Sequence, residues 1–264
     1  MRLFATMCNQ PQRLLEALAP ARAALVAAPP VDRWGLGYVQ SGELLLARTP
    51  RPSETALDLY QALEGIKSDC VIGQVVPDNG LDGTDNTPPF RYRRWMFCQD
   101  GPSSAGAAAD ALAAHVPDFI RRSIRGRSTT ELAFHVLMAM LHDLGVLDDP
   151  NLPLATTRGA VMAASTLVAG ELTRAGVTTP LGNLAVSNGR SLLVARIGPP
   201  LWMRSLHVLN DRGDRDAAFR GVLLVSADER EPGPPGGCDG FEEIPRGSVV
   251  EISRDVRVDV HPAA

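Results

Sequence analysis

Short apolar runs rich in β-branched residues alternate with polar turns through the first hundred residues, a pattern typical of strands. The turn Gln40-Ser41-Gly42 lies between two such runs and predicts a hairpin. The run Cys-Val-Ile-Gly-Gln-Val-Val at 70–76 is apolar on both faces, as in a strand at the centre of a layered fold. We expect strands at 2–8, 34–39, 43–47, 70–76 and 94–98.

Apolar residues recur at helical spacing in other segments. Ser128 and Glu131 form a capping box at the start of the most apolar of these, so a helix is predicted over 128–147. Pro11 suits a first helical turn, Pro20 interrupts that helix, and Ser53 is a candidate N-cap. We expect helices at 11–26 with a break at Pro20, 53–66, 103–115, 128–147 and 157–175.

The C-terminal half returns to strands. Asn188-Gly189 is a strong hairpin signal between two apolar runs. The loop at 77–92 is too long for a simple connection and is typical of a segment that lines a site, whereas 229–240, rich in Pro and Gly, is predicted to be mobile. The expected strands are 183–187, 190–197, 201–208, 219–226, 249–252 and 256–260.

Strands interrupted by long apolar helices, without regular βαβ alternation, favour an α+β fold in which helices cover stacked sheets. The length of 264 residues favours a single domain over 1–264. The sequence contains neither a dinucleotide-binding glycine fingerprint nor a P-loop, so no nucleotide cofactor is expected.

The composition narrows the class further. Apolar residues make up 45% of the chain and no run of about 18 of them predicts a membrane span. The net charge of −4 argues against nucleic acid or anionic membrane as a partner. The basic cluster noticed in the sequence consists of Arg121, Arg122, Arg125 and Arg127 and is interpreted as a solvated surface.

The cysteines and histidines do not indicate a metal site. Cys8, Cys70, Cys98 and Cys238 have neither zinc-ligand nor disulfide spacing, and the first residues lack a signal peptide, so a reducing cytoplasm is expected. His135 and His142 share one helix face, but no third ligand is spaced to match them. We expect no metal and no cofactor.

Six segments carry the strongest functional signal. They are the opening Met-Arg-Leu-Phe-Ala, Asp-Arg-Trp-Gly-Leu-Gly-Tyr at 32–38, Val-Ile-Gly-Gln-Val-Val at 71–76, Asp-Asn-Thr-Pro-Pro-Phe at 85–90, Trp-Met-Phe-Cys-Gln-Asp-Gly at 95–101 and Gly-Arg-Ser-Thr-Thr-Glu at 126–131. In order and spacing they resemble the active-site segments of bacterial class II glutamine amidotransferases, whose nucleophile is an N-terminal cysteine. The resemblance implies an N-terminal-nucleophile-hydrolase-like fold with four layers, αββα, in which two antiparallel sheets lie between helices.

The chemically active residues of that family are replaced in this chain. Arg2 stands at the cysteine position, so Met1 is expected to be retained and no N-terminal nucleophile is exposed. Val76 replaces the arginine that clamps the glutamine carboxylate, and Thr129 replaces the aspartate that binds the amino group. Asp100 replaces the asparagine of the oxyanion hole, and Gly101 stands at the position of its glycine. Histidine positions of the family hold Gln74, Pro88 and Gln99.

These replacements predict a degenerate site. An ionised Asp100 opposes the charge of an oxyanion, and loss of both charged clamps weakens recognition of a free amino acid. Two interpretations remain for the positions themselves. Either they have become ordinary core and loop residues, or they form a neutral to weakly acidic vestigial pocket of Gln74, Val76, Asp100, Gly101 and Thr129.

The main functional hypothesis is therefore a catalytically inactive amidotransferase-like protein, not an enzyme, that acts as a binding, scaffold or regulatory module. It would bind a protein partner or itself. The alternative is a divergent amidotransferase or hydrolase that acts on an amide with Thr6 or Cys8 as nucleophile after proteolytic processing. A third reading is a divergent domain that dimerises or docks through exposed sheet edges.

Overall fold

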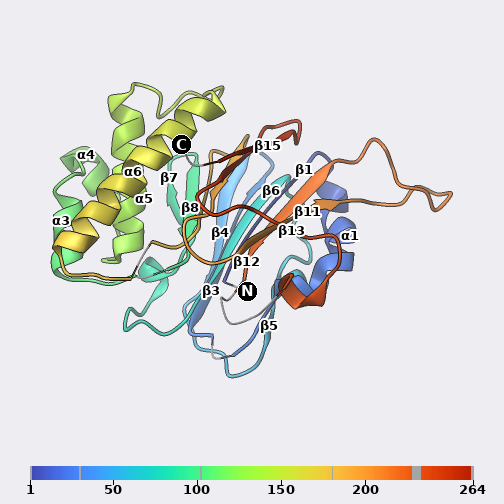
Figure 1. Ribbon diagram of the computed structural model, residues 1–264, viewed down its shortest axis with the longest axis horizontal. Coiled ribbons are helices and arrows are strands. Elements are labelled where there is room, and N and C mark those ends of the chain that lie inside the picture. The colour runs from blue at the N-terminus through green and yellow to red at the C-terminus, as the bar shows by residue number, and fades with distance from the viewer. Residues whose placement is uncertain (1, 30, 102, 180, 228–232, 263–264) are drawn as a thin grey trace.

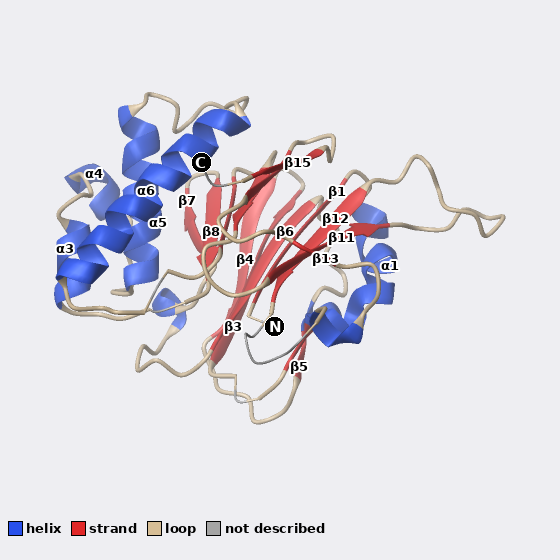
Figure 2. Ribbon diagram, in the orientation of Figure 1, coloured by secondary structure: helices blue, strands red, loops and turns tan. Residues whose placement is uncertain are grey.

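The molecule has four layers: helices, a six-stranded sheet, a seven-stranded sheet and a second, smaller set of helices (Figure 1). The computed structural model describes residues 2–29, 31–101, 103–179, 181–227 and 233–262. The two sheets face each other between the helical layers, as the secondary-structure colouring shows (Figure 2). The expected αββα arrangement of antiparallel sheets is confirmed.

The seven-stranded sheet has the order β13-β11-β12-β1-β6-β3-β4. Its central strand, β1, pairs antiparallel with both β6 and β12, and Leu3 lies opposite Gln74 on one side and Ser226 on the other. The strands are β1 (Leu3–Cys8), β3 (Arg33–Gln40), β4 (Glu43–Thr49), β6 (Cys70–Val76), β11 (Leu201–Leu206), β12 (Gly221–Ser226) and β13 (Glu242–Glu243).

The six-stranded sheet has the order β15-β14-β10-β9-β8-β7, again with antiparallel pairs. Its strands are β7 (Phe90–Tyr92), β8 (Trp95–Gln99), β9 (Leu184–Ser187), β10 (Leu192–Ala195), β14 (Val249–Ile252) and β15 (Val258–His261). A separate pair, β2 (Val26–Ala27) with β5 (Leu57–Asp58), forms a short ribbon.

The helices divide between the two outer faces (Figure 1). Those on the six-stranded sheet are α3 (Ala107–Ala113), α4 (Asp118–Arg121), α5 (Thr129–Asp143) and α6 (Leu154–Arg174). The smaller set on the seven-stranded sheet is α1 (Leu14–Leu18) and α2 (Leu59–Ala62), with 3-10 turns at η1 (Pro11–Arg13), η2 (Ala19–Leu25) and η4 (Pro235–Gly237). The remaining turn, η3 (Thr84–Asn86), belongs to the loop before β7.

Strand β1 shows why the central strands are apolar on both faces. Leu3, Ala5 and Met7 pack in the core between the sheets, while Phe4 and Cys8 pack under the smaller helices. All six residues of the strand are buried. The Phe4 ring lies where a Cβ at position 73 would be, so the neighbouring strand needs Gly73 for this close approach.

The start of α5 confirms Ser128 as the N-cap, which is one half of the predicted capping box. Ser128 Oγ accepts a hydrogen bond from the backbone N–H of Glu131 at 3.1 Å. The Glu131 carboxylate accepts bonds from the N–H groups of Arg125 and Gly126, so it secures the preceding loop. The helix ends at Asp143 and not at 147, because Gly145 has φ 71° and its N–H bonds to the carbonyl of His142.

Two further predicted helices were too long. Over 53–66 the one helix is α2, which follows β5 and is capped by Asp58, whereas Ser53 bonds locally to Thr55 and pairs with Val31 as an isolated bridge. The helix expected at 103–115 begins only at 107, after Gly106 with φ 87°. Ser104, before Gly106, is bonded to Thr129 at the start of α5, which places it beside the candidate site.

Smaller differences concern boundaries. Helix α6 starts at 154 after Pro153, earlier than the expected 157, and β7 forms inside the predicted loop 77–92. Met1 and residues 228–232 lie outside the described residues, so the prediction for Met1 and that for the first part of the 229–240 loop are not addressed. No helix in the described part of the chain is long and apolar enough to cross a bilayer.

Candidate functional site

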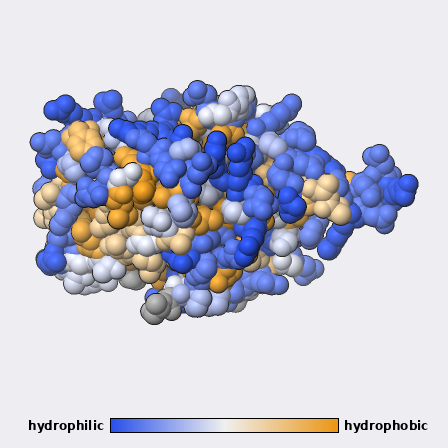
Figure 3. All heavy atoms as spheres, turned by 90° about the horizontal axis from the view of Figure 1, so that it is seen from above, coloured by the Kyte–Doolittle hydropathy of each residue, from blue (hydrophilic) through white to orange (hydrophobic). Residues whose placement is uncertain are grey.

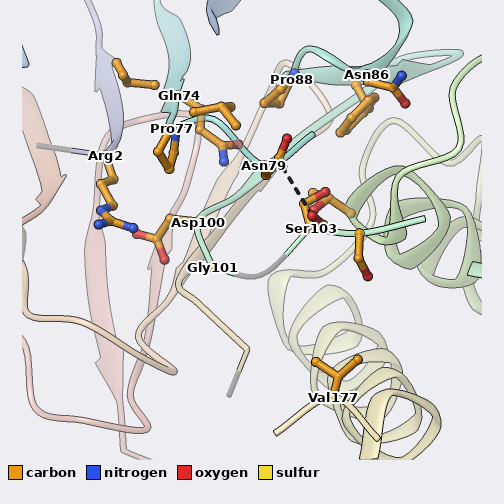
Figure 4. Close-up of a pocket in the computed structure, with 15 residues that line it drawn as sticks. Arg2, Gln74, Pro77, Asn79, Asn86, Pro88, Asp100, Gly101, Ser103 and Val177 are labelled. Atoms are coloured by element: carbon orange, nitrogen blue, oxygen red, sulfur yellow. Dashed lines mark hydrogen bonds between the residues drawn. The ribbon is translucent and has the colours of Figure 1, made fainter. Parts of the chain in front are cut away.

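A pocket of about 250 Å³ opens where β1 starts and where β6 and β8 end (Figure 4). Backbone bonds fix its first member, Arg2, since its N–H donates to Ser226 O at 3.1 Å and its carbonyl accepts from Val75 N–H at 2.8 Å. Four further predicted positions line the same cavity: Gln74, Val76, Asp100 and Gly101. The loops add Asn79, Asn86, Pro88, Ser103 and Ser104, and the first turn of α5 adds Thr130.

Asp100 is the electrostatic centre of the pocket. Its carboxylate accepts hydrogen bonds from Ser226 Oγ and, at 2.6 Å, from the backbone N–H of Asn183. The Arg2 guanidinium points toward the same carboxylate (Figure 4). Burial raises the pKa of Asp100 from 3.8 to about 6, while both hydrogen bonds and the charge of Arg2 oppose that rise. Asp100 is therefore mostly ionised at neutral pH, beside a positive charge.

The turn after β8 is packed closely. Gly101 adopts φ +115°, a conformation that side chains with a Cβ rarely adopt, and its neighbour across the turn is Gly182. Asp100 N–H donates to Asn183 O at 2.9 Å, while the Asn183 N–H returns to the Asp100 side chain. These reciprocal bonds fix the position of the carboxylate.

Gln74 joins the two sheets at the floor of the pocket. Its Nε2 donates to the carbonyl of Gln99 at 2.6 Å, and its Oε1 accepts from the N–H of Gln99 at 3.1 Å. The bonded backbone belongs to β8 in the six-stranded sheet, whereas Gln74 belongs to β6 in the seven-stranded sheet. The Gln99 side chain lies under the helices, beside Ala133 and Leu137, and does not line this pocket.

Thr129 is also absent from the pocket lining. Its Oγ1 accepts from the N–H of Ser104 at 3.1 Å, and its own N–H donates to the carbonyl of Ser104 at 2.8 Å. Thr129 thus holds Ser104 in place, and the next residue, Thr130, lines the cavity instead.

Arg33 was not among the site residues predicted from the sequence. It is almost fully buried, pairs with Asp32 across 2.8 Å and donates to the side chain of Asn79. It also lies directly opposite Val76 in the β3–β6 register. A buried cation therefore stands behind the pocket wall, next to the position from which the family resemblance expects an arginine. An arginine within a run of apolar and glycine residues was the available sequence signal.

The alternative nucleophiles lie away from this pocket. Cys8 is at the other end of β1, roughly 20 Å along the strand. It is buried, and burial raises the pKa of its thiol to about 11. Thr6 is also buried, and its hydroxyl donates to Val222 O at 2.8 Å. Burial likewise raises the pKa of Cys70 to about 12 and that of Cys98 well above its usual range.

The two histidines of α5 occupy different environments. His135 is buried, with Nδ1 2.8 Å from the carbonyl of Glu131, and burial lowers its pKa. His142 is exposed and lies 3.3 Å from Asp143. Within the described ranges no three His, Cys, Asp or Glu side chains come together as metal ligands.

Comparison with known proteins defines the fold class. No protein-family model matches the sequence, and no curated protein matches it at a significant level. Solved structures do resemble it. A glutamine aminotransferase class-II domain protein from Silicibacter pomeroyi has a TM-score of 0.60 and 19% identity, with 100% of both chains covered. A predicted glutamine amidotransferase from Pseudomonas aeruginosa PA01 has a TM-score of 0.59 and 14% identity, covering 98% of this chain and 99% of that one.

A larger protein shares the same fold in part. The glutamine phosphoribosylpyrophosphate amidotransferase from B. subtilis has a TM-score of 0.51 and 12% identity, and the match covers 99% of this chain but 49% of that chain. The TM-scores show a likeness of fold, and at these low identities the likeness concerns the fold alone. The expected N-terminal-nucleophile-hydrolase-like fold of class II glutamine amidotransferase proteins is thereby confirmed.

Proposed function

We propose that this protein is a catalytically inactive relative of the class II glutamine amidotransferases whose former active site is a binding pocket. The observation that carries the proposal is the pair Arg2 and Asp100. Arg2 stands at the start of β1, where the resemblance expects the nucleophile, and its guanidinium points toward Asp100, which stands where the resemblance expects an oxyanion-hole amide (Figure 4). A cation and an anion thus occupy the reaction centre.

The remaining lining supports binding without chemistry. The described residues around the cavity include no cysteine and no histidine, so the pocket has neither a thiol nor an imidazole base. It offers neutral amides and hydroxyls from Gln74, Asn79, Asn86, Ser104 and Thr130. Without an arginine at Val76 or an aspartate at Thr129, the pocket suits a small neutral polar molecule better than a free α-amino acid.

The hydrolase alternative receives no support from the geometry. Processing before Thr6 or Cys8 would remove residues of β1 that pair with both β6 and β12 at the centre of the sheet. A thiol with a pKa of about 11 is protonated at neutral pH and is a weak nucleophile.

The glutaminase assay tests the proposal. The native protein should release no ammonia from glutamine, and Arg2→Cys should also be inactive after intact mass has shown that Met1 is removed. The assay is run above the pKa of Asp100, so that the carboxylate is ionised. Its charge then opposes an oxyanion whose stabilisation by each donor is usually worth about 3 kcal/mol.

A matched variant makes the result informative. Arg2→Cys/Val76→Arg/Asp100→Asn/Thr129→Asp restores the nucleophile, the oxyanion-hole amide and the two charged substrate clamps that the resemblance expects. Ammonia release by native protein, or by Arg2→Cys alone, would contradict the proposal. Circular dichroism and thermal unfolding of each variant check that inactivity does not reflect misfolding.

The proposal extends to a single domain, a cytoplasmic location and a protein partner or self-association. All four cysteines are free, as is typical of a reducing compartment.

Hydrophobic side chains gather over the helical end of the molecule (Figure 3). Beside α6, Met162, Leu181, Ile197 and Val249 line an apolar groove of about 540 Å³. Light scattering would show whether the chain self-associates.

A further inference from the structure

A second cleft, of about 730 Å³, lies at the opposite end of the sheets from the pocket. Strand β6 runs between them: Asp69, just before its first residue, lines the cleft, and Val76, its last residue, lines the pocket. Strand β8 also connects the two cavities, since Arg94, just before it, lines the cleft and Asp100, just after it, lines the pocket. The two cavities are thus roughly 20 Å apart along the strands.

The cleft is built where several chain reversals meet. Its walls come from the β3–β4 turn, the segment before β6, the β7–β8 hairpin, the β9–β10 turn and the β14–β15 turn. These segments belong to both sheets. Paired strands hold each of them, so the side chains they present start from fixed backbone positions.

The charge of the cleft differs from that of the whole chain. It holds the cationic side chains Lys67, Arg91, Arg93, Arg94, Arg190 and Arg254, with Glu43 and Asp69 as the acidic ones. The chain as a whole has a net charge of −4. Cations gathered in a concave surface raise the local concentration of anions.

Most of these cations lack a carboxylate partner. Among the described residues, Arg93 is the one member of the six with a carboxylate within 4.0 Å, that of Asp148. Arg91 donates to the neutral carbonyl of Leu44 at 2.8 Å, and Arg190 donates to the side chain of Asn151 at 3.1 Å. The positive charges of Lys67, Arg91, Arg94, Arg190 and Arg254 therefore remain available to a ligand.

The lining also limits the ligand class. Guanidinium groups match phosphate oxygens with paired hydrogen bonds, and several of them can hold more than one phosphoryl group. The described lining contains no aromatic side chain, so there is no platform for stacking bases of a single-stranded nucleic acid. The volume falls within the range of small-molecule sites.

We propose that this cleft binds a small, multiply charged anion that carries two or more linked phosphoryl groups. Arg94, Arg190 and Arg254 approach it from three separate turns, and Lys67 and Arg91 supply further positive charge. The site shares no lining residue with the Arg2–Asp100 pocket and does not depend on the function proposed there.

Isothermal titration calorimetry with inorganic pyrophosphate and triphosphate tests the proposal. The native protein should bind both, triphosphate more tightly, and orthophosphate more weakly than either. Arg94→Gln/Arg190→Gln/Arg254→Gln should weaken binding by about a hundredfold or more, since a charge-assisted contact typically contributes around tenfold or more.

The surface cluster noticed in the sequence provides the matched control. Arg122→Gln/Arg125→Gln/Arg127→Gln removes the same number of charges from residues that do not line the cleft, and it should change affinity by less than about threefold. Thermal unfolding of both variants checks folding. Absence of pyrophosphate and triphosphate binding by the native protein, or equal losses in the two variants, would overturn the proposal.

A lipid headgroup could present the same phosphoryl chemistry, and flotation with phosphatidic acid vesicles separates the two sources. If the ligand is a small soluble anion, the native protein should not float with the vesicles, or triphosphate should release the protein from them. Flotation that triphosphate does not reverse would overturn the assignment to a small soluble anion.

Discussion

Gly182→Ala should lower the free energy of unfolding by about 3 kcal/mol, near the upper end of typical overpacking costs. A Cβ at position 182 would overlap the carbonyl group of Asp100, and backbone atoms cannot move aside as a flexible side chain can. The reciprocal bonds between Asp100 and Asn183 hold the two segments together, so relief of the clash would break them. Urea unfolding measures the change.

Gly159→Ala is the matched control. This glycine lies within α6, is exposed and has open space where a Cβ would be added. Alanine there should stabilise the protein by about 0.5 to 1 kcal/mol through helix propensity. If Gly182→Ala were as stable as the native protein, that result would contradict the close approach of Gly182 to the backbone of Asp100.

The stability contribution of Asp100 should fall as pH rises from about 4 to above 6, by about 3 kcal/mol in total. The folded-state pKa lies above the ordinary value, so between 3.8 and about 6 the folded protein retains a proton that the unfolded chain has released. Proton uptake therefore favours the folded state at low pH, and the advantage is lost as pH rises through the folded pKa.

Asp100→Asn isolates this effect, because an amide does not titrate in this range. Burial also raises the pKa values of Asp69 and Glu131, and both groups remain in the variant, so their contribution cancels in the difference. Urea unfolding of both proteins across this pH range gives that difference. Parallel pH profiles would show that Asp100 titrates in the folded protein as it does in the unfolded chain.

The sequence predicted the central layers well, because strands buried on both faces have an unmistakable pattern. The apolar runs at 2–8 and 70–76 became β1 and β6, and the Ser128 cap starts α5 as expected. The predictions that failed depended on tertiary competition. Ser53 had a local partner in Thr55 and a bridge to Val31, so its capping role was lost to Asp58.

The candidate site was predictable where strand ends fix positions. Arg2, Gln74, Val76, Asp100 and Gly101 gather around one pocket because antiparallel pairing aligns the ends of β1 and β6 and the bonds of Gln74 bring β8 alongside. Thr129 illustrates the limit of such reasoning. Adjacent helix residues point about 100° apart, so the choice between them depends on how α5 is oriented about its axis, and Thr130 lines the cavity in place of Thr129.

The phosphoryl-binding cleft could not have been predicted in the same way. The run Arg-Tyr-Arg-Arg at 91–94 was visible in the sequence, but Lys67, Arg190 and Arg254 are far from it along the chain. They meet only because the sheet orders place their turns at one end of the molecule. The net charge of the whole chain is negative, so a count of charges does not reveal that the cleft is positively charged.

The two-point bond between Gln74 and the backbone of Gln99 determines which parts of the pocket can adapt to a guest molecule. Because these bonds join the two sheets at the floor of the pocket, the floor cannot widen without breaking both of them. Any change of shape on ligand binding must therefore occur at the rim of the pocket. That rim is formed by the chain around Asn79 and Asn86 and by the segment at Ser103 and Ser104. Ligand selectivity should therefore evolve by changes in these loops, while the strands beneath them stay constant.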